Sequence, residues 1–248
     1  MKKYLVILFV LSHIFISYAQ DAATSKGESA VGLLGEKTRL GINFNPLFSW
    51  SRTPGAQTDN KGVRMGFQIG LQVDYYFAKN YGLTTGLYFD YLGTNLEYIL
   101  AKNDSLGNPY NKTYSHKYTS QYIEVPLGLK LRTNEFKRIT VYGELGIATM
   151  FLVSARGTYD TDFDDMKYEQ KKVYATRVNF LDVAASGGAG IEYNIAGKTS
   201  LVAGVVYKYA FLNHIKDDKA KDVKPLNIGL SEDPIYLNYF AFRIGVLF

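Results

Sequence analysis

Charged residues stand at alternate positions inside otherwise apolar stretches of this 248-residue chain, where they could pair with one another or carry ions. Glu124 and Lys130 interrupt one run of valine and leucine, and Arg243 interrupts the last run before the C-terminus. Because an unpaired buried charge is very costly, charges that share an interior must form salt bridges. We therefore predict a network of paired charges on one face, with the cations Arg64, Lys130, Arg132, Lys208 and Arg243 and the anions Asp74, Asp90, Glu124, Glu144, Asp182 and Glu192.

Catalytic chemistry has little support in the sequence. Beyond the N-terminal segment the histidines are His116 and His214, and we expect both in polar loops at the surface. No Gly-x-Ser-x-Gly turn occurs, which would present a nucleophilic serine. We predict that the protein is not an enzyme. A serine–histidine pair that acts on lipid in an outer leaflet is the alternative.

The carboxylate-rich segment 160–165, Asp-Thr-Asp-Phe-Asp-Asp, begins like a calcium-binding loop. Asp165 stands where such a loop requires glycine, and Lys171 stands where it requires a bidentate glutamate. We therefore predict a solvated loop, with no metal site and no cofactor; contact with divalent ions shared with lipopolysaccharide phosphates is the alternative. The glycine-rich segment 187–190 has no helix after it and is no nucleotide cradle. Its glycines are expected to make room for tyrosine side chains.

The elements that must position these charges are β-strands. A period of two dominates from residue 37 onward, no stretch shows a helical period, and the 21 Tyr and 15 Phe suit strands. Each stretch is long enough for the roughly 9–11 residues of a tilted transmembrane strand. The predicted strands are eight: 37–50, 63–77, 82–100, 113–132, 138–156, 173–193, 198–213 and 235–248.

The connections between these strands alternate in length. Long connections are expected at 51–62, 101–112, 157–172 and 214–234, and short turns at 78–81, 133–137 and 194–197. An up-and-down barrel of the outer membrane has short turns on the periplasmic side and long loops outside. The predicted fold is therefore all-β: an eight-stranded antiparallel up-and-down transmembrane β-barrel.

The two faces of each strand differ in a way that favours lipid outside the barrel. Bulky aliphatic residues alternate with glycine, tyrosine and isolated charges, which suits a lipid-facing wall around a tight polar lumen. A soluble lipocalin-type barrel, the alternative, would place apolar residues inside. Side chains fill the interior of an eight-stranded barrel, so we favour a salt-bridged plug over an ion path.

The N-terminal segment predicts export. Lys2 and Lys3 precede an apolar run over residues 4–16, and Ser17-Tyr18-Ala19 forms a small-x-small cleavage site before Gln20. We expect a signal peptide over 1–19 cleaved between Ala19 and Gln20, a flexible periplasmic leader over 20–36 and a barrel domain over 37–248. The chain has no cysteine for a lipid anchor, and its scattered charges (net +5) do not favour nucleic acid as a partner.

One strand resembles a known family. Gln121-Tyr122-Ile123-Glu124-Val125-Pro126 is similar to the Tyr-x-Glu-x-Pro strand of PorT-like outer-membrane β-barrels of gram-negative bacteria. Gly188-Ala189-Gly190-Ile191-Glu192-Tyr193 is similar to the glycine-rich sixth strand of that family, and the chain ends in Phe248, as many barrels do. The resemblance implies an eight-stranded barrel of the OmpA/OmpX kind. PorT itself resembles a component of a secretion machinery.

These patterns predict a monomeric outer-membrane protein with a side-chain-filled lumen, whose structural or surface-interaction role depends on four long extracellular loops. A narrow transport or secretion-accessory barrel is the alternative. The expected partners are outer-membrane lipid and lipopolysaccharide, the barrel-assembly machinery during insertion, and an extracellular or periplasmic protein.

Overall fold

The computed structural model describes residues 37–54, 58–103, 109–161, 164–170, 178–215 and 234–248. The predicted signal peptide and leader lie outside these residues. The chain divides into two units, Met1–Thr38 and Arg39–Phe248, and the barrel described here belongs to the second. In the described part of the chain, no helix is long and apolar enough to cross a membrane.

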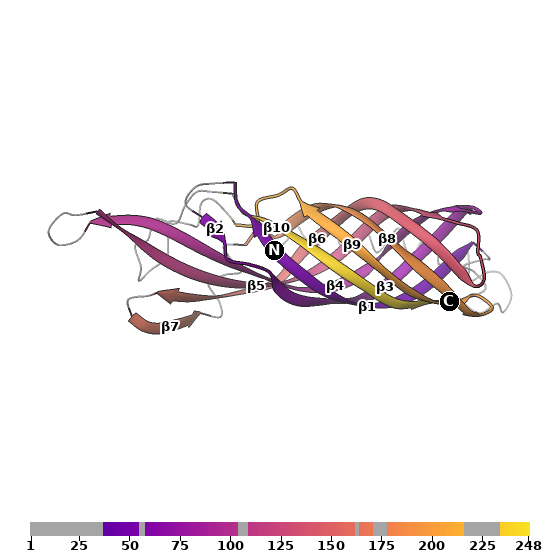
Figure 1. The fold of residues 1–248 in the computed structure, drawn as a ribbon, viewed down its shortest axis with the longest axis horizontal. Helices are drawn as coiled ribbons and strands as arrows, with labels where there is room; N and C mark the ends of the chain where they lie inside the picture. The colour runs from indigo at the N-terminus through magenta and orange to yellow at the C-terminus, as the bar shows by residue number, and fades with distance from the viewer. Residues whose placement is uncertain (1–36, 55–57, 104–108, 162–163, 171–177, 216–233) are drawn as a thin grey trace, which may run out of the picture. The chain divides into compact units, whose positions relative to one another are not determined.

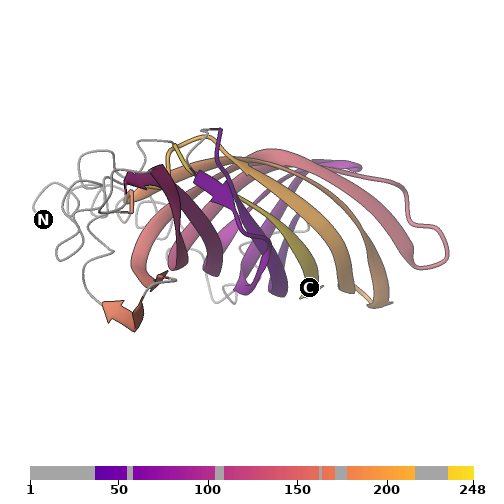
Figure 2. The same ribbon diagram turned by 60° about the vertical axis from the view of Figure 1, so that its left-hand side comes forward.

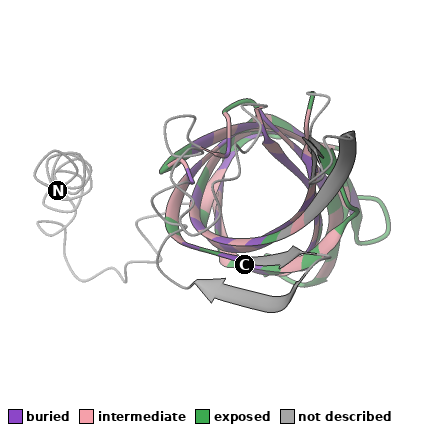
Figure 3. Ribbon diagram, turned by 90° about the vertical axis from the view of Figure 1, so that its left-hand side faces the viewer, coloured by how far each residue is buried: buried purple, intermediate pink, exposed green. Residues whose placement is uncertain are grey.

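Eight long antiparallel strands close into a barrel, which confirms the predicted fold class (Figures 1 and 3). Around the barrel their order is β4-β3-β1-β10-β9-β8-β6-β5, and pairing of β5 with β4 completes the circle. Two short strands, β2 (Thr58–Asn60) and β7 (Asp164–Gln170), pair with β4 and β6. The eight barrel strands are β1 (Thr38–Arg52), β3 (Arg64–Ala78), β4 (Tyr81–Asn103), β5 (Pro109–Arg132), β6 (Ile139–Thr161), β8 (Leu181–Ala196), β9 (Thr199–Ala210) and β10 (Tyr236–Leu247).

The first and last strands join to remove both sheet edges. β1 pairs with β10 from Gly41 opposite Leu247 to Arg52 opposite Tyr236. Next to this pairing, the backbone amides of Leu40 and Phe248 each donate to the other residue's carbonyl, at 2.9 and 2.8 Å. Closure leaves no unpaired strand edge in the wall, as a barrel in lipid requires.

The connections differ at the two ends of the barrel. At the end that carries Phe248, called the inner end, short turns join β3 to β4, β5 to β6, and β8 to β9. The last of these turns contains Gly197 at φ 56°, a left-handed conformation that favours glycine. At the opposite, outer end the long connections contain strand structure (Figure 2).

Several predicted boundaries are wrong at the outer end. The expected loop 51–62 contains the end of β1 and all of β2. The expected loop 101–112 is largely a hairpin, because β4 and β5 stay paired up to Asn103 opposite Pro109. The expected loop 157–172 contains the end of β6 and all of β7. The sixth barrel strand begins at Leu181 among the described residues, since residue 178 forms only an isolated bridge to Ile215; residues 173–177 of the predicted strand lie outside the described residues. These segments lack a continuous apolar face, so backbone pairing and not side-chain alternation makes them strands.

The wall separates an apolar outside from a polar inside, as the alternation predicts. Outward aliphatic side chains such as Leu71, Leu127 and Ile244 are more than half exposed. Inward side chains on the same strands, such as Gln72 and Glu124, are buried. Figure 3, which looks along the barrel, shows exposed and buried residues alternating around the wall.

Candidate functional site

The inner third of the lumen is held by one buried lysine. Lys130 of β5 is fully buried and lies 2.7 Å from Asp74 of β3 and 2.7 Å from Glu192 of β8. Arg39 of β1 donates to the second oxygen of Glu192 at 2.6 Å, and Gln72 donates to Asp74 at 2.7 Å. Arg132 of β5 lies 3.9 Å from the same oxygen of Glu192. The two carboxylates are thus surrounded by three cations, so neither is left unpaired in the interior.

A bidentate ion pair crosses the middle of the lumen. The two terminal nitrogens of Arg243 donate to the two carboxylate oxygens of Glu144 at 2.6 and 2.7 Å. Arg243 lies on β10 and Glu144 on β6, and β9 and β8 separate these strands in the sheet. The pair therefore spans the lumen and does not run along the wall, and its fork geometry is the strong form of an arginine–carboxylate contact.

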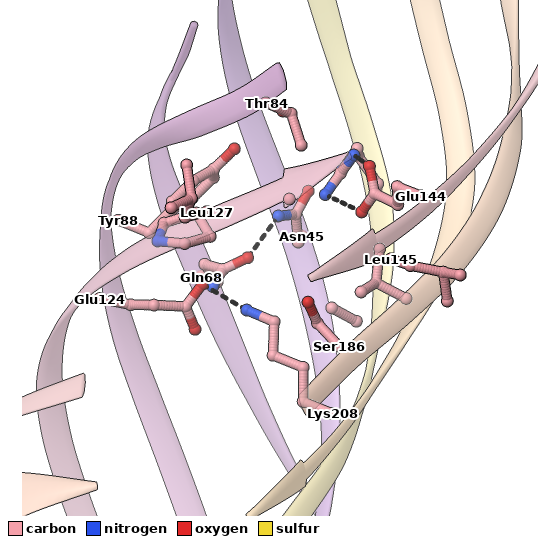
Figure 4. Close-up of a pocket in the computed structure, with 15 residues that line it drawn as sticks. Asn45, Gln68, Thr84, Tyr88, Glu124, Leu127, Glu144, Leu145, Ser186 and Lys208 are labelled. Atoms are coloured by element: carbon pink, nitrogen blue, oxygen red, sulfur yellow. Dashed lines mark hydrogen bonds and ion pairs between the residues drawn. The ribbon is translucent and has the colours of Figure 1, made fainter. Parts of the chain in front are cut away.

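A third network lies toward the outer end (Figure 4). Lys208 of β9 donates to Glu124 of β5, and the hydroxyl of Tyr239 donates to the other oxygen of Glu124 at 2.7 Å. Gln68 donates to Asp90 at 2.7 Å. Figure 4 shows Lys208 extending toward Glu124.

Little free space remains between these networks. The cavity lined by Asn45, Gln68, Glu124, Lys208 and Arg243, among others, has a volume of about 20 Å³. A cavity needs roughly 10–15 Å³ to hold one water molecule, so this one has room for about one. It is too small to hold a continuous column of water.

Apolar side chains close the lumen at its outer end. They form one buried cluster from several strands and from residues 178 and 235 in the outer connections: Leu47, Leu92, Leu96, Tyr118, Tyr122, Met150, Ala155, Val178, Ala184, Val206, Ala210, Ile235, Leu237, Tyr239 and Ala241. Packed apolar side chains exclude water. The lumen thus has a charged lower part and an apolar lid.

His214 belongs to this lid, which corrects the prediction of a surface histidine. Its side chain is 1 % exposed, with Nε2 3.3 Å from the Ser120 hydroxyl and Nδ1 3.0 Å from the Tyr122 hydroxyl. The β9–β10 connection that carries it folds inward, where the amide of His214 donates to the carbonyl of Ile235 at 2.6 Å. Burial lowers the pKa of His214 from 6.5 to about 4, so the imidazole is neutral at pH 7.

The Ser120–His214 contact has the residue types of a nucleophile and its base, but its surroundings differ from those of a catalytic site. Ser120 is 2 % exposed, and the second imidazole nitrogen contacts a tyrosine and not a carboxylate. A catalytic pair needs a path for substrate and an orienting partner for the base. Here both groups lie within the packed lid.

Two of the predicted lumenal charges stand apart from the networks. Asp182 is buried at the start of β8, where one oxygen accepts from the amide of Val183 at 2.7 Å and the other has no hydrogen-bond partner. Arg64, in contrast, does not point into the lumen. Its guanidinium donates to the carbonyl of Tyr118 at 2.8 Å and lies among side chains of the outer wall. The long side chain starts at the outer end of β3 and turns across Gly93, which leaves room for it.

Family comparison identifies the barrel. The model for the outer membrane protein beta-barrel domain matches residues 18–216, which is most of the chain. The protein belongs to this family.

Solved structures of outer-membrane barrels are similar to the chain at low identity. Neisserial surface protein A is 9 % identical, and the match covers 86 % of this chain and 96 % of that chain with a TM-score of 0.43. OprG of Pseudomonas aeruginosa is 15 % identical, and the match covers 85 % of this chain and 94 % of that chain with a TM-score of 0.41. Ail, the attachment invasion locus protein of Yersinia pestis, is 14 % identical, and the match covers 86 % of this chain and 99 % of that chain with a TM-score of 0.34. No curated protein matches the chain in sequence.

For an outer-membrane β-barrel protein, the apolar outer wall is the lipid contact. Aromatic rings gather on it in two groups: Phe44, Phe67, Phe89 and Tyr91 on β1, β3 and β4, and Trp50, Tyr207 and Phe240 on β1, β9 and β10. Aromatic girdles of this kind mark the interface between lipid and water in membrane barrels. The match is to the broad barrel family, so membership of the PorT-like group stays a prediction.

Sequence reasoning missed several lumenal residues. Arg39, Asn43, Asn45 and Gln68 complete the networks, and Asn45 donates to Gln68 at 2.6 Å. For Asn43 and Asn45 the available signal was their alternation with Ile42 and Phe44 on the first strand, and for Gln68 it was the alternation with Phe67 and Ile69 on β3. The expected role of the glycines is correct for Gly190: a Cβ there would lie 2.5 Å from the Tyr142 hydroxyl.

No group of three or more metal-binding side chains occurs in the part of the chain that the structure describes. The backbone of residues 160–161 and 164–165 belongs to β6 and β7, whereas their side chains, like that of His116, lie outside the description.

Proposed function

We propose that this outer-membrane barrel is closed to solutes and acts at the cell surface through the structures at its outer end. The lumen carries the proposal: three networks of paired charges fill it, the central cavity holds about one water molecule, and an apolar cluster covers the top. A conducting pore needs a continuous water-filled path. A lumen of this composition favours a structural plug.

The outer end supports a surface-interaction role. β4 and β5 continue as a paired hairpin up to Asn103 and Pro109, while β6 and β7 form a second extension. Paired strands hold their shape beyond the membrane and offer a defined surface to a protein or glycan. We propose that this surface binds a partner outside the cell.

The buried lid supports a role without catalysis. Among the described residues, Ser120 and His214 form a serine–histidine contact, but both are nearly fully buried, and Tyr122 contacts the second nitrogen of the imidazole. We also propose that the chain is a monomer in contact with lipid and lipopolysaccharide and that the barrel-assembly machinery inserts it. Nucleic acid and cofactors have no part in this function.

A secretion-accessory role is the second candidate, and the Tyr-x-Glu-x-Pro strand favours it through its resemblance to PorT-like barrels. In this chain Tyr122 and Glu124 pack in the lumen, and the carbonyl of Pro126 accepts a hydrogen bond from Thr85 at 2.7 Å. Loss of secreted proteins from the medium after deletion of the gene would support this candidate over the first.

Single-cysteine labelling on intact cells tests the first proposal, because the native chain has no cysteine. A membrane-impermeant thiol reagent should label Asn103→Cys in the outer hairpin and should not label Lys79→Cys in an inner turn. Ser186→Cys, on the central lumen cavity, should also stay unlabelled. Labelling of Ser186→Cys would show an open lumen and contradict the proposal.

A further inference from the structure

A cluster of three cations lies on the outside of the barrel wall, away from the lumenal networks. Arg64 of β3, Lys117 of β5 and Arg156 of β6 line one cavity of about 210 Å³. The other lining side chains are polar or aromatic: Tyr91, Thr119, Gln121 and Ser154. None of these seven residues is acidic, and three of them are basic.

Strand register brings these residues together. Gln121 of β5 lies opposite both Tyr91 of β4 and Ser154 of β6, and Thr119 lies opposite Arg156. The bulge of β6 between residues 152 and 154 shifts the register by one residue at this point. Below the bulge the even-numbered residues of β6 face the lumen, whereas above it the even-numbered Ser154 and Arg156 face outward.

The cluster marks the height at which the lipid-facing surface ends. Below it, Ile123 of β5 lies between Phe89 of β4 and Phe151 of β6, and the outward residues further down these strands are mostly apolar. One pair higher, the outward residues become Gln121 and Ser154. On β5 and β6 the paired outward residues thus change from apolar to polar at one level, although Val153 at the bulge of β6 is an exposed apolar residue. At the same level β4 carries Tyr91, which stacks on Phe67 with ring centroids 5.4 Å apart. Such a level corresponds to the lipid headgroups of the outer leaflet.

Arg64 is fixed in a position that serves this cavity. Its terminal nitrogen Nη1 donates to the carbonyl of Tyr118 at 2.8 Å and to the hydroxyl of Thr119 at 3.3 Å. The absence of a side chain at Gly93 allows this approach, since a Cβ there would lie 2.8 Å from Nε of Arg64. Lys117 and Arg156 are exposed beside it and form no ion pair with another described residue.

We propose that Arg64, Lys117 and Arg156 bind the phosphate group of an outer-leaflet lipid of the lipopolysaccharide class. Three cations, two of them guanidinium groups with several N–H donors, suit a phosphate monoester. The position at the end of the apolar wall lets the acyl chains of the same lipid contact Phe89 and Ile123. The site lies on the outer wall, so the proposal holds whether or not the lumen is closed.

The test measures binding of purified lipopolysaccharide to the full chain in detergent micelles by native mass spectrometry. Lipopolysaccharide with phosphorylated lipid A is compared with the same material after enzymatic dephosphorylation. The decisive variant is Lys117→Gln/Arg156→Gln, because both side chains are exposed and the structural contacts of Arg64 stay intact. Lys79→Gln/Lys198→Gln removes the same charge at the inner end and is the matched control.

We expect the double variant to bind the phosphorylated form about 30-fold more weakly, from about 1 kcal/mol for each basic residue at a lipid surface. The control should stay within about twofold of the wild type, and the charge-preserving Lys117→Arg/Arg156→Lys should keep the affinity. Equal binding of the dephosphorylated form, or an equal loss in the control, would overturn the proposal. Saturation of the wild type by inorganic phosphate alone, with the same dependence on Lys117 and Arg156, would assign the site to a soluble anion and overturn the lipid as ligand.

Discussion

Replacing Arg243 with leucine should destabilise the barrel without opening it. The change removes both hydrogen bonds to Glu144, at 2.6 and 2.7 Å, and leaves that carboxylate in an interior where its side chain is 8 % exposed. Loss of one partner of a buried ion pair costs about 3–5 kcal/mol, because the remaining charge is uncompensated. The cation of Lys208 contacts a different carboxylate, Glu124, and does not replace Arg243.

The double variant Arg243→Leu/Glu144→Leu separates this charge effect from a loss of packing. Replacing both members of a buried ion pair by apolar residues is often close to neutral. We therefore expect the double variant to recover most of the stability that Arg243→Leu loses. Urea unfolding in lipid vesicles, followed by the fluorescence emission of Trp50, measures the stability of both variants. Trp50 is the only tryptophan and stacks on Tyr207 at the lipid face.

Two results would refute this reasoning. If Arg243→Leu lowers the free energy of unfolding by less than about 1 kcal/mol, the pair contributes no more than a solvent-exposed ion pair does. A double variant as unstable as the single one would show that packing, and not the uncompensated carboxylate, sets the cost.

Three further predictions follow from the same structure. Because the pKa of His214 falls from 6.5 to about 4 on folding, the wild type should lose up to about 3 kcal/mol of unfolding free energy as the pH falls from 6.5 to 4. His214→Gln should lack this extra loss. Parallel pH profiles of the wild type and His214→Gln would contradict the prediction. The folded protein should resist SDS at room temperature and change its mobility on boiling, because the closed wall has no free edge; unchanged mobility would count against the barrel. The native protein should begin at Gln20, and an intact mass that includes residues 1–19 would contradict cleavage after Ala19.

The sequence predicted the strands of the barrel wall better than the side-chain contacts inside the lumen. Alternation of residues such as Val125, Leu127 and Leu129 with polar ones defined the strands, because one face contacts lipid along its whole length. The end of the hairpin, beyond the predicted strand end at residue 100, lacks that apolar face, so its strand structure had no periodic signal. Periodicity also assigned a face to Arg64 but not the path of its long side chain, which leaves the strand end and crosses Gly93.

The partners in the salt bridges could not be predicted from strand alternation alone. Alternation gives the height and face of Arg243, but its partner lies on β6, three positions around the barrel, and only closure of the sheet brings Glu144 within reach. The burial of His214 depends on a connection that folds back into the lumen, which no local pattern of residues indicates. Uncharged partners such as Asn45 and Gln68 were missed because amides in strands also occur in solvent.

The measurement that tests the closed lumen most directly is the conductance of the purified full chain in a planar lipid bilayer. Paired charges, a cavity of about 20 Å³ and an apolar lid predict a bilayer that stays electrically tight for both the wild type and Arg243→Leu. A stable, well-defined conductance in the wild type, whose ion selectivity changes in Arg243→Leu with little loss of stability, would show that the lumen is a channel.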